Sequence, residues 1–199
     1  MRVWFCWFAG VYLSAKLGQF EAMKSTTTLP EAVSNGKGLL DKAKALELEL
    51  PSDLERLAIA RGCNYYMRDL APFDNAEGVA FSNAELAIAL LIVTSPPEAR
   101  SVRLAAAMLG ASDVAAEDVV KLAVEEDCSA IVRYIAAAGA RFEPGNSLWK
   151  SLLGLLPEAK VELDNLPHPT RFVEMTGIER GKVGTTFRWV RPQHKTNPR

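Results

Sequence analysis

Residues 98–142 have the sequence EARSVRLAAAMLGASDVAAEDVVKLAVEEDCSAIVRYIAAAGARF. The segment VRLAAA, which begins at Val102, returns as VRYIAA at Val132, 30 residues later. Both copies are apolar and rich in alanine, and each is followed by a glycine, Gly110 or Gly139. A hydrophobic helical pattern that recurs at such a period is typical of stacked helical hairpins. The stretch therefore predicts a mostly α fold.

The helical pattern continues on both sides of this stretch. Hydrophobic periodicity and capping signals predict helices over about 39–50, 52–70, 83–93, 97–109, 115–127, 130–138 and 147–156. Within 52–70, Gly62 indicates either a break in the helix or a close contact with another helix. Ser52 with Glu55 matches a capping box, Ser82 or Asn83 is expected to cap the 83–93 helix, and Asn146 the last one. Pro97 is expected in the first turn of its helix.

Gly110 is expected to end the 97–109 helix in the left-handed conformation that favours glycine. Gly139 is expected to end the 130–138 helix.

The predicted architecture is a set of stacked antiparallel helical hairpins, a short right-handed superhelix-like bundle, with a C-terminal extended or β-hairpin-like arm. Three segments follow: a flexible N-terminal segment and linker over 1–38, a helical domain over 39–157, and an extended basic arm over 158–199. Within the arm, the β-like runs RFVEMTGI and TTFRWVRP flank ERGKVG, which predicts a hairpin.

Two units, 83–110 and 115–139, resemble a HEAT-like repeat of the shorter bacterial kind. The second helix of such a repeat carries Val-Arg, then alanines and a closing glycine. The matching residues are Val102, Arg103, Ala105, Ala106 and Gly110 in one unit and Val132, Arg133, Ala136, Ala137 and Gly139 in the other. Two units fall below the three or so that a continuous repeat core needs, so the flanking helices are expected to act as caps.

The resemblance implies a non-catalytic interaction or scaffold module that presents a surface to a protein partner or to nucleic acid. Arg103 and Arg133 are the candidate surface residues of the repeat. The alternative interpretation is that each arginine pairs, inside the stack, with a neighbouring carboxylate or with the C-terminus of a helix.

Charge is unevenly distributed along the chain. Residues 52–157 carry 9 basic and 14 acidic side chains, whereas residues 166–199 carry 7 basic and 2 acidic ones. The formal net charge of −1 predicts no partner by itself. The chain is an acidic body with a basic tail.

The sequence 187–191, FRWVR, alternates aromatic and basic residues. Such a strand can stack bases and neutralise phosphates, so nucleic-acid binding is the alternative function. The candidate binding residues of the arm are Arg171, Lys182, Arg188, Trp189 and Arg191. A competing interpretation places Phe187 and Trp189 in an apolar seam against the helices and the arginines on the acidic body.

Motifs for catalysis, metals and cofactors are missing from the sequence. The cysteines Cys6, Cys63 and Cys128 are odd in number and far apart, which indicates buried thiols in a reducing compartment. Neither histidine, His168 or His194, belongs to a metal or nucleophile motif. We expect no cofactor, no metal and no enzyme activity, with an enzyme whose site assembles only in space as the third hypothesis.

The N-terminal run VWFCWFAGVYLSA, residues 3–15, is apolar but shorter than the about 20 residues that cross a bilayer. Residues 1–22 therefore have three interpretations: a start assigned upstream of the true Met23, a secretory signal or membrane-surface anchor, or a packed helix. The protein is expected to be soluble and cytoplasmic, or exported or membrane-associated if residues 1–22 are a signal or anchor.

Overall fold

The computed structural model describes residues 38–63, 65, 73, 76–158, 166–176 and 186–193. The chain divides into two compact units, Met1–Ala32 and Val33–Arg199, and every described residue belongs to the second. The three interpretations of residues 1–22 therefore lie outside the described residues and stay predictions.

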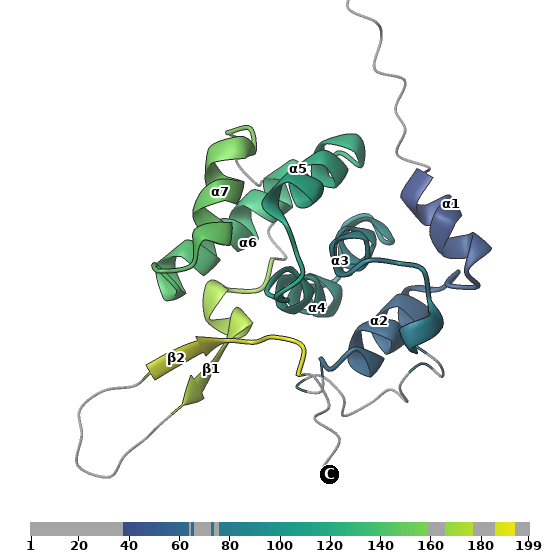
Figure 1. The fold of residues 1–199 in the computed structure, drawn as a ribbon, viewed down its shortest axis with the longest axis horizontal. Coiled ribbons are helices and arrows are strands. Elements are labelled where there is room, and N and C mark those ends of the chain that lie inside the picture. The colour runs from purple at the N-terminus through teal and green to yellow at the C-terminus, as the bar shows by residue number, and fades with distance from the viewer. Residues whose placement is uncertain are drawn as a thin grey trace, which may run out of the picture. The chain divides into compact units, whose positions relative to one another are not determined.

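The described part of the chain is mostly helical, with a small antiparallel sheet near the C-terminus (Figure 1). This confirms the predicted fold class. The elements are α1 (Gly38–Ala45), α2 (Pro51–Ala60), the 3-10 turn η2 (Ala76–Gly78), α3 (Asn83–Ile92), α4 (Ala99–Leu109), α5 (Ala116–Glu125), α6 (Ser129–Phe142), α7 (Ser147–Leu155), the 3-10 turn η3 (Pro169–Phe172), and the strands β1 (Val173–Thr176) and β2 (Thr186–Trp189).

Helices α3 and α4 form the centre of the unit and make its most extensive helix–helix contact. Helix α3 also contacts α1, α2 and α5, and α5 in turn contacts α6 and α7. In Figure 1, α1 and α2 lie on one side of this central pair and α5, α6 and α7 on the other. The C-terminal segment completes the arrangement, because η3 contacts both α4 and α6, and β2 contacts α6.

The sequence of α3 explains its central position. It has no charged residue after Glu85, and its side chains from Leu86 to Leu91 are all buried. A helix that is apolar all round must be covered on all sides. Its start is the predicted one: the Ser82 hydroxyl accepts the Glu85 N–H at 3.0 Å, and the Glu85 carboxylate accepts the Ser82 N–H at 2.7 Å.

Helix α2 differs from the prediction at both ends. It begins at Pro51 with Leu50 as N-cap, and the Asp53 carboxylate accepts the Leu50 N–H at 2.9 Å, so Ser52 is not the cap. It ends at Ala60, well before residue 70, because Gly62 adopts φ +109° and its carbonyl accepts the Gln193 N–H at 2.9 Å. The Gly62 N–H donates to the Ile59 carbonyl at 2.9 Å and the Cys63 N–H to the Ala58 carbonyl at 3.1 Å, so a glycine motif ends the helix, and Gln193 packs against it.

The first turn of α4 also differs. Its N-cap is Glu98 and its first residue is Ala99, so Pro97 precedes the helix instead of lying in its first turn.

Helix α4 ends at Gly110 as predicted, but Gly110 does not adopt the predicted left-handed conformation, and Gly139 does not end its helix. Gly110 has φ −77°, an ordinary right-handed value, and α6 continues through Gly139 to Phe142. Both positions instead make room for a tryptophan. A Cβ on Gly110 would stand 2.8 Å from Cδ1 of Trp189, and a Cβ on Gly139 would overlap the Trp149 ring. These residues are glycines because indole rings lie against them.

The contact between Gly139 and Trp149 predicts that replacing this helical glycine by alanine destabilises the protein, whereas Gly→Ala in a helix usually stabilises it. Gly139→Ala should lower the free energy of unfolding by about 1–3 kcal/mol, since the methyl group forces the buried Trp149 ring to move. The matched control is Gly154→Ala in α7, where a Cβ meets no heavy atom within 4 Å. There the usual gain of helix propensity, about 0.5–1 kcal/mol, should appear. Thermal and urea unfolding measure both variants, and a stabilised Gly139→Ala protein would contradict the tryptophan seat.

Candidate binding surface at the C-terminal hairpin

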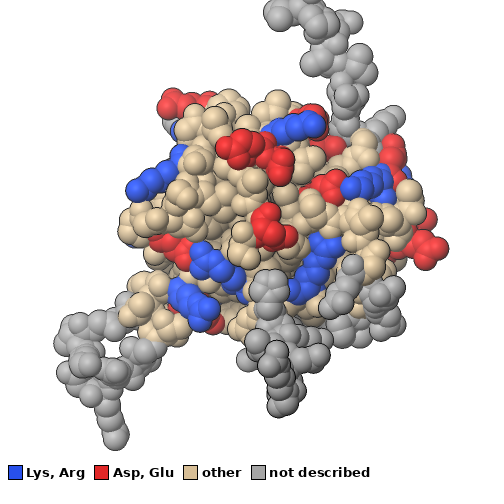
Figure 2. Space-filling view, viewed as in Figure 1, with Lys and Arg blue, Asp and Glu red and all other residues tan. Residues whose placement is uncertain are grey.

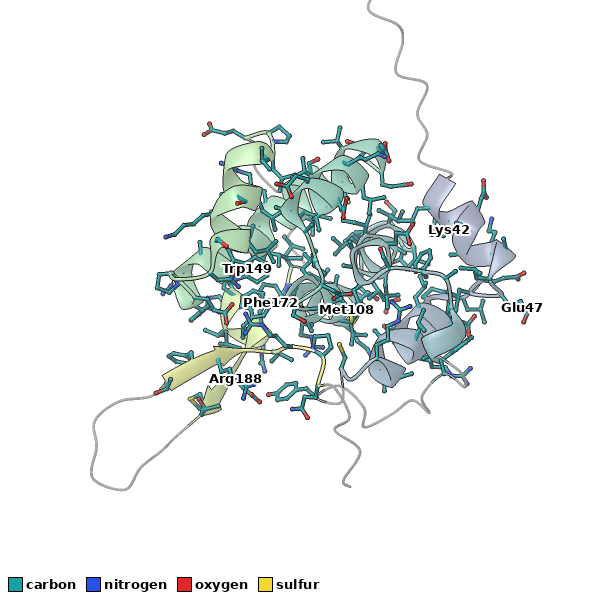
Figure 3. All side chains as sticks on the ribbon, in the orientation of Figure 1. Lys42, Glu47, Met108, Trp149, Phe172 and Arg188 are labelled. Atoms are coloured by element: carbon teal, nitrogen blue, oxygen red, sulfur yellow. The ribbon has the colours of Figure 1, made fainter. Side chains whose placement is uncertain are left out.

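The strand β2 is anchored in the helical core by Trp189. The Trp189 side chain is fully buried, and its indole N–H donates to the Ala106 carbonyl of α4 at 2.9 Å. The ring centroid of Trp189 lies 4.8 Å from that of Trp149 and 5.5 Å from that of Phe172. Figure 3 shows Trp149 and Phe172 near the point where the hairpin meets the helices. The C-terminal arm is therefore part of the core at this end.

Arg191 adds a second anchor directly after the strand. Its guanidinium forms two parallel bonds with the Glu143 carboxylate, at 2.6 and 2.5 Å, and its Nε–H donates to the Gly110 carbonyl at 2.8 Å. Burial raises the pKa of the Glu143 carboxyl, but hydrogen bonds donated by Arg191, Trp149 and Asn146 outweigh burial and hold the pKa below its ordinary value. Bidentate hydrogen bonds between arginine and a carboxylate are among the strongest side-chain interactions, so this pair holds the segment after β2 in place.

One face of the described strands β1 and β2 is apolar. The antiparallel register pairs Val173 with Trp189 and Met175 with Phe187. Because side chains alternate across a strand, these two pairs share a face. Val173 and Trp189 are buried, whereas Met175 is 65% and Phe187 is 42% exposed. The apolar face therefore runs out from the core and past the edge of the helices, where the strands extend beyond them in Figure 1.

The end of α6 meets this exposed pair. The ring centroid of Phe142 lies 5.6 Å from that of Phe187, and the Arg141 guanidinium lies 5.6 Å from the Phe142 centroid. We call Phe142, Met175 and Phe187 the apolar patch. Met175, Phe142 and Arg141 were not among the residues that the sequence singled out. The alternation of the 173–176 run was the available signal, but it does not say which end of the strand leaves the core.

The opposite face of the hairpin carries charge. Glu174 pairs with Arg188 in the register, and both line a cavity of about 540 Å³ whose other wall includes Gly62, Tyr65 and Gln193. Figure 3 shows Arg188 on the hairpin, away from the helical core. A second cavity of about 410 Å³ lies between the α4–α5 connection and the start of α7, and it is bordered by Arg191, which is already paired with Glu143. Neither cavity holds a group of acids, bases and nucleophiles that suggests catalysis.

The candidate binding residues of the arm have different positions. Arg188 and Arg171 are exposed, on β2 and η3 respectively. Trp189 is buried against the helices and Arg191 is paired with Glu143, as in the interpretation that packs the strand on the helical body. Phe187 stays exposed, unlike in that interpretation. Lys182 lies outside the described residues. With no exposed ring face, Trp189 has no surface on which a base could stack.

The candidate surface residues of the repeat make contacts with backbone carbonyls. Arg133 donates to the Leu153 and Leu156 carbonyls at 2.7 and 3.0 Å, so it satisfies the C-terminal end of α7. Arg103 donates to the Ala99 carbonyl one turn earlier in its own helix, at 3.2 Å. Arg133 therefore pairs with the C-terminus of a helix inside the stack, which is the alternative interpretation of this residue.

The described residues give little support for chemistry. Among them, no three His, Cys, Asp or Glu side chains come together as a metal site. Burial raises the pKa of the Cys63 thiol to about 12, and burial together with Glu126 and Asp127 raises that of Cys128 to about 12 as well. None of the described helices combines the length and the apolar character that crossing a bilayer requires.

The two thiols should resist alkylation in the folded protein. At pH 8 a thiol with such a pKa is ionised to about one part in ten thousand, and only the thiolate reacts. Iodoacetamide labelling followed by peptide mapping should leave Cys63 and Cys128 unmodified in native buffer and modify both in denaturant. Rapid labelling of either residue under native conditions would show that its site opens to solvent.

The Arg191–Glu143 pair should make the hairpin sensitive to acid. A depressed carboxyl pKa contributes stability above the unfolded-state value of about 4.3, and this contribution is lost as the pH falls through the lower folded-state value. Glu143→Gln should therefore lower stability at neutral pH by about 1–3 kcal/mol and flatten its loss below pH 4. Unfolding followed by tryptophan fluorescence measures this, with Glu117→Gln on α5 as control. An unchanged acid profile in Glu143→Gln would contradict the role of the pair.

Comparison with protein-family models, with curated proteins and with solved structures finds no match for this chain. The case for a function therefore rests on the geometry of the hairpin and the helices that hold it.

Proposed function

We propose that this chain is a non-catalytic interaction module, a short stack of HEAT-like helical hairpins that binds a protein partner through its C-terminal hairpin. The observation that carries the proposal is the apolar patch of Phe142, Met175 and Phe187. It lies on the same face of the hairpin that, one residue pair nearer the helices, is fully buried. A contiguous apolar surface of this kind marks an interaction site on a folded protein.

The patch differs from the other exposed apolar residues of the described chain. Exposed side chains such as Leu50, Val124 and Leu155 belong to different parts of the chain, and single exposed apolar residues are normal on protein surfaces. In the patch, Met175 and Phe187 lie opposite each other on paired strands and Phe187 contacts Phe142. Methionine and aromatic residues are also the apolar types enriched at interfaces.

The anchors of the hairpin suit it to binding. Trp189 and Arg191 attach one end of the ribbon to α4, α6 and α7. Residues that are already held in place lose less conformational entropy when a partner binds, so more of the contact energy becomes affinity. The helices act in this proposal as the support of the binding element.

The HEAT-like part of the proposal rests on the contacts of the doubled sequence. Helices α3 and α4 pack together, α5 and α6 pack together, and α3 contacts α5, as expected for successive stacked hairpins. Ala105, Ala106 and Ala107 of α4 and Ala136 and Ala138 of α6 are buried, which lets neighbouring helices approach closely. Ala137, which the repeat pattern also includes, is exposed. The C-terminal segment that contacts both α4 and α6 is additional to such a repeat.

Nucleic-acid binding is the second candidate function. The exposed Arg188 and Arg171 on β2 and η3 favour it, since exposed arginines can meet a phosphate backbone. The burial of Trp189 removes the best stacking ring of the predicted set.

Affinity capture from a lysate of the source cells tests the leading proposal. The bait is the full chain, compared with the double variant Met175→Ser/Phe187→Ser and with the matched control Val124→Ser/Leu155→Ser. The control removes two equally exposed apolar side chains from α5 and α7. A protein recovered with the wild-type chain and the control should be reduced about tenfold or more with the hairpin variant, and its binding should be reproduced with purified components.

Two controls separate the alternatives. Both hairpin residues are exposed, so thermal unfolding should show that the variant remains folded. Nuclease treatment should leave the captured protein in place, and a salt titration with DNA and RNA tests the second function, whose affinity would fall steeply with salt. Equal recovery by all three baits would exclude the patch as the binding surface.

A further inference from the structure

We propose that the cavity between the charged face of the hairpin and the end of α2 binds a small zwitterion, a dipeptide with an apolar side chain. The ammonium group of the ligand pairs with Glu174 and its carboxylate pairs with Arg188. Both residues lie on the face of the strands opposite the apolar patch. The inference therefore goes beyond the proposed function and does not depend on it.

The cavity has the size and the walls of a small-ligand site. Its volume of about 540 Å³ lies within the roughly 300–1,000 Å³ typical of such sites. Glu174 and Arg188 line it from the hairpin, and Gly62 and Tyr65 line it from the end of α2. Residues 190–193, which also line the cavity, connect the hairpin to Gly62.

Backbone contacts hold the two walls together. The Gly62 carbonyl accepts the Gln193 N–H at 2.9 Å, and the Val190 N–H donates to the Phe172 carbonyl at 2.9 Å. A Cβ on Gly62 would stand 2.2 Å from the Gln193 carbonyl oxygen, so the backbones touch at this end of the cavity. A cavity whose walls are already in place loses little conformational entropy when a ligand enters.

The cavity presents one unpaired cation and one unpaired anion. Glu174 and Arg188 lie directly opposite each other in the register. Within the part of the chain that the structure describes, neither side chain forms an ion pair or a side-chain hydrogen bond. Arg191 also lines the cavity, but its guanidinium is bonded to Glu143. Figure 2 shows that most Asp and Glu side chains of this face lie over the helices, away from the hairpin.

This pair of charges selects a ligand that carries both signs. A simple anion attracted by Arg188 would be repelled by Glu174, and a simple cation would meet the reverse. Residues opposite each other on antiparallel strands have Cβ atoms about 4.5–5.5 Å apart, and the two charged groups of a dipeptide are attached to Cα atoms about 3.8 Å apart. A dipeptide therefore satisfies both side chains at once, through charge-assisted hydrogen bonds. Contact between Glu174 and Arg188 themselves offers little competition, because exposed ion pairs are weak.

The rest of the lining favours an apolar side chain on the ligand. Val190 and Pro192 line the cavity, and Tyr65, which is 57% exposed, forms part of the wall opposite the strands. A ring or a branched aliphatic group placed here would remove apolar surface of both partners from water. Polar groups that set the orientation within an otherwise apolar lining are typical of small-molecule sites.

Three forms of one ligand test the charge requirement by isothermal titration calorimetry with the full chain. The forms are alanyl-phenylalanine, its N-acetyl derivative, which has only the carboxylate, and its C-terminal amide, which has only the ammonium. The zwitterion should bind about tenfold or more tightly than either derivative, because each derivative leaves one charged side chain without its partner. Free phenylalanine should bind more weakly than the dipeptide, and tighter binding of the amino acid would overturn the dipeptide as ligand.

Protein variants assign the two ends of the ligand. Glu174→Gln should remove the preference for alanyl-phenylalanine over the N-acetyl form, and Arg188→Gln should remove its preference over the amide. The matched controls Glu117→Gln on α5 and Lys150→Gln on α7 neutralise exposed charges outside the cavity and should keep both preferences. Thermal unfolding should show that all four variants remain folded.

The outcomes separate this inference from the proposed function. Absence of binding at millimolar concentration, equal binding of the three forms, or preferences that survive both cavity variants would overturn the zwitterion site. Tightest binding of the N-acetyl form would overturn it in favour of a site for anions. Met175→Ser/Phe187→Ser should bind the dipeptide as the wild-type chain does, and loss of binding in this variant would place the ligand elsewhere and overturn the cavity site. The capture experiment with the apolar patch is decided independently of these results.

Discussion

Two tryptophans seated on two glycines hold the C-terminal segment to the helices. Trp189 lies against Gly110, Trp149 lies against Gly139, and the two indoles pack on each other at a centroid distance of 4.8 Å. A two-stranded ribbon is at best marginally stable alone. The buried Trp189 ring and its bond to Ala106 give this ribbon a fixed position. The Arg191–Glu143 pair and the apolar patch both depend on that position.

The contacts of Gly110 and Gly139 with tryptophan rings also explain why the doubled sequence carries these glycines. In a repeat solenoid, a glycine after an alanine-rich helix is a helix stop, and the next repeat covers the exposed side. Here the glycines admit indole rings, and η3 contacts both α4 and α6. The C-terminal segment thus covers apolar surface that a further repeat would otherwise cover.

Local signals predicted the elements of this fold, and long-range contacts decided the rest. The Ser82 cap, the Asn146 cap and the β1–β2 hairpin depend on neighbours within a few residues, and the structure confirms them. The end of α2 follows the local signal of Gly62, whereas the contact between Gly62 and Gln193, more than a hundred residues away, is carried by no local pattern. The candidate site shows the same contrast between local and long-range information. The sequence singled out Arg188 but not the apolar patch. Strand alternation shows which side chains share a face, but it does not show which of them extend beyond the helices.

The sequence FRWVR at 187–191 shows how one strand can serve both fold and surface. Its two aromatic residues share a face, yet Trp189 is buried and Phe187 is exposed, because they lie at different distances from the helices. Its two arginines differ in the same way, since Arg191 meets Glu143 while Arg188 faces solvent. Aromatic and basic residues occur at both ends of this segment, so the distance of each residue from the anchor at Trp189 and Arg191 decides whether it is buried or exposed. The residues nearest the anchor stabilise the fold, and those beyond it, Phe187 and Arg188, stay exposed.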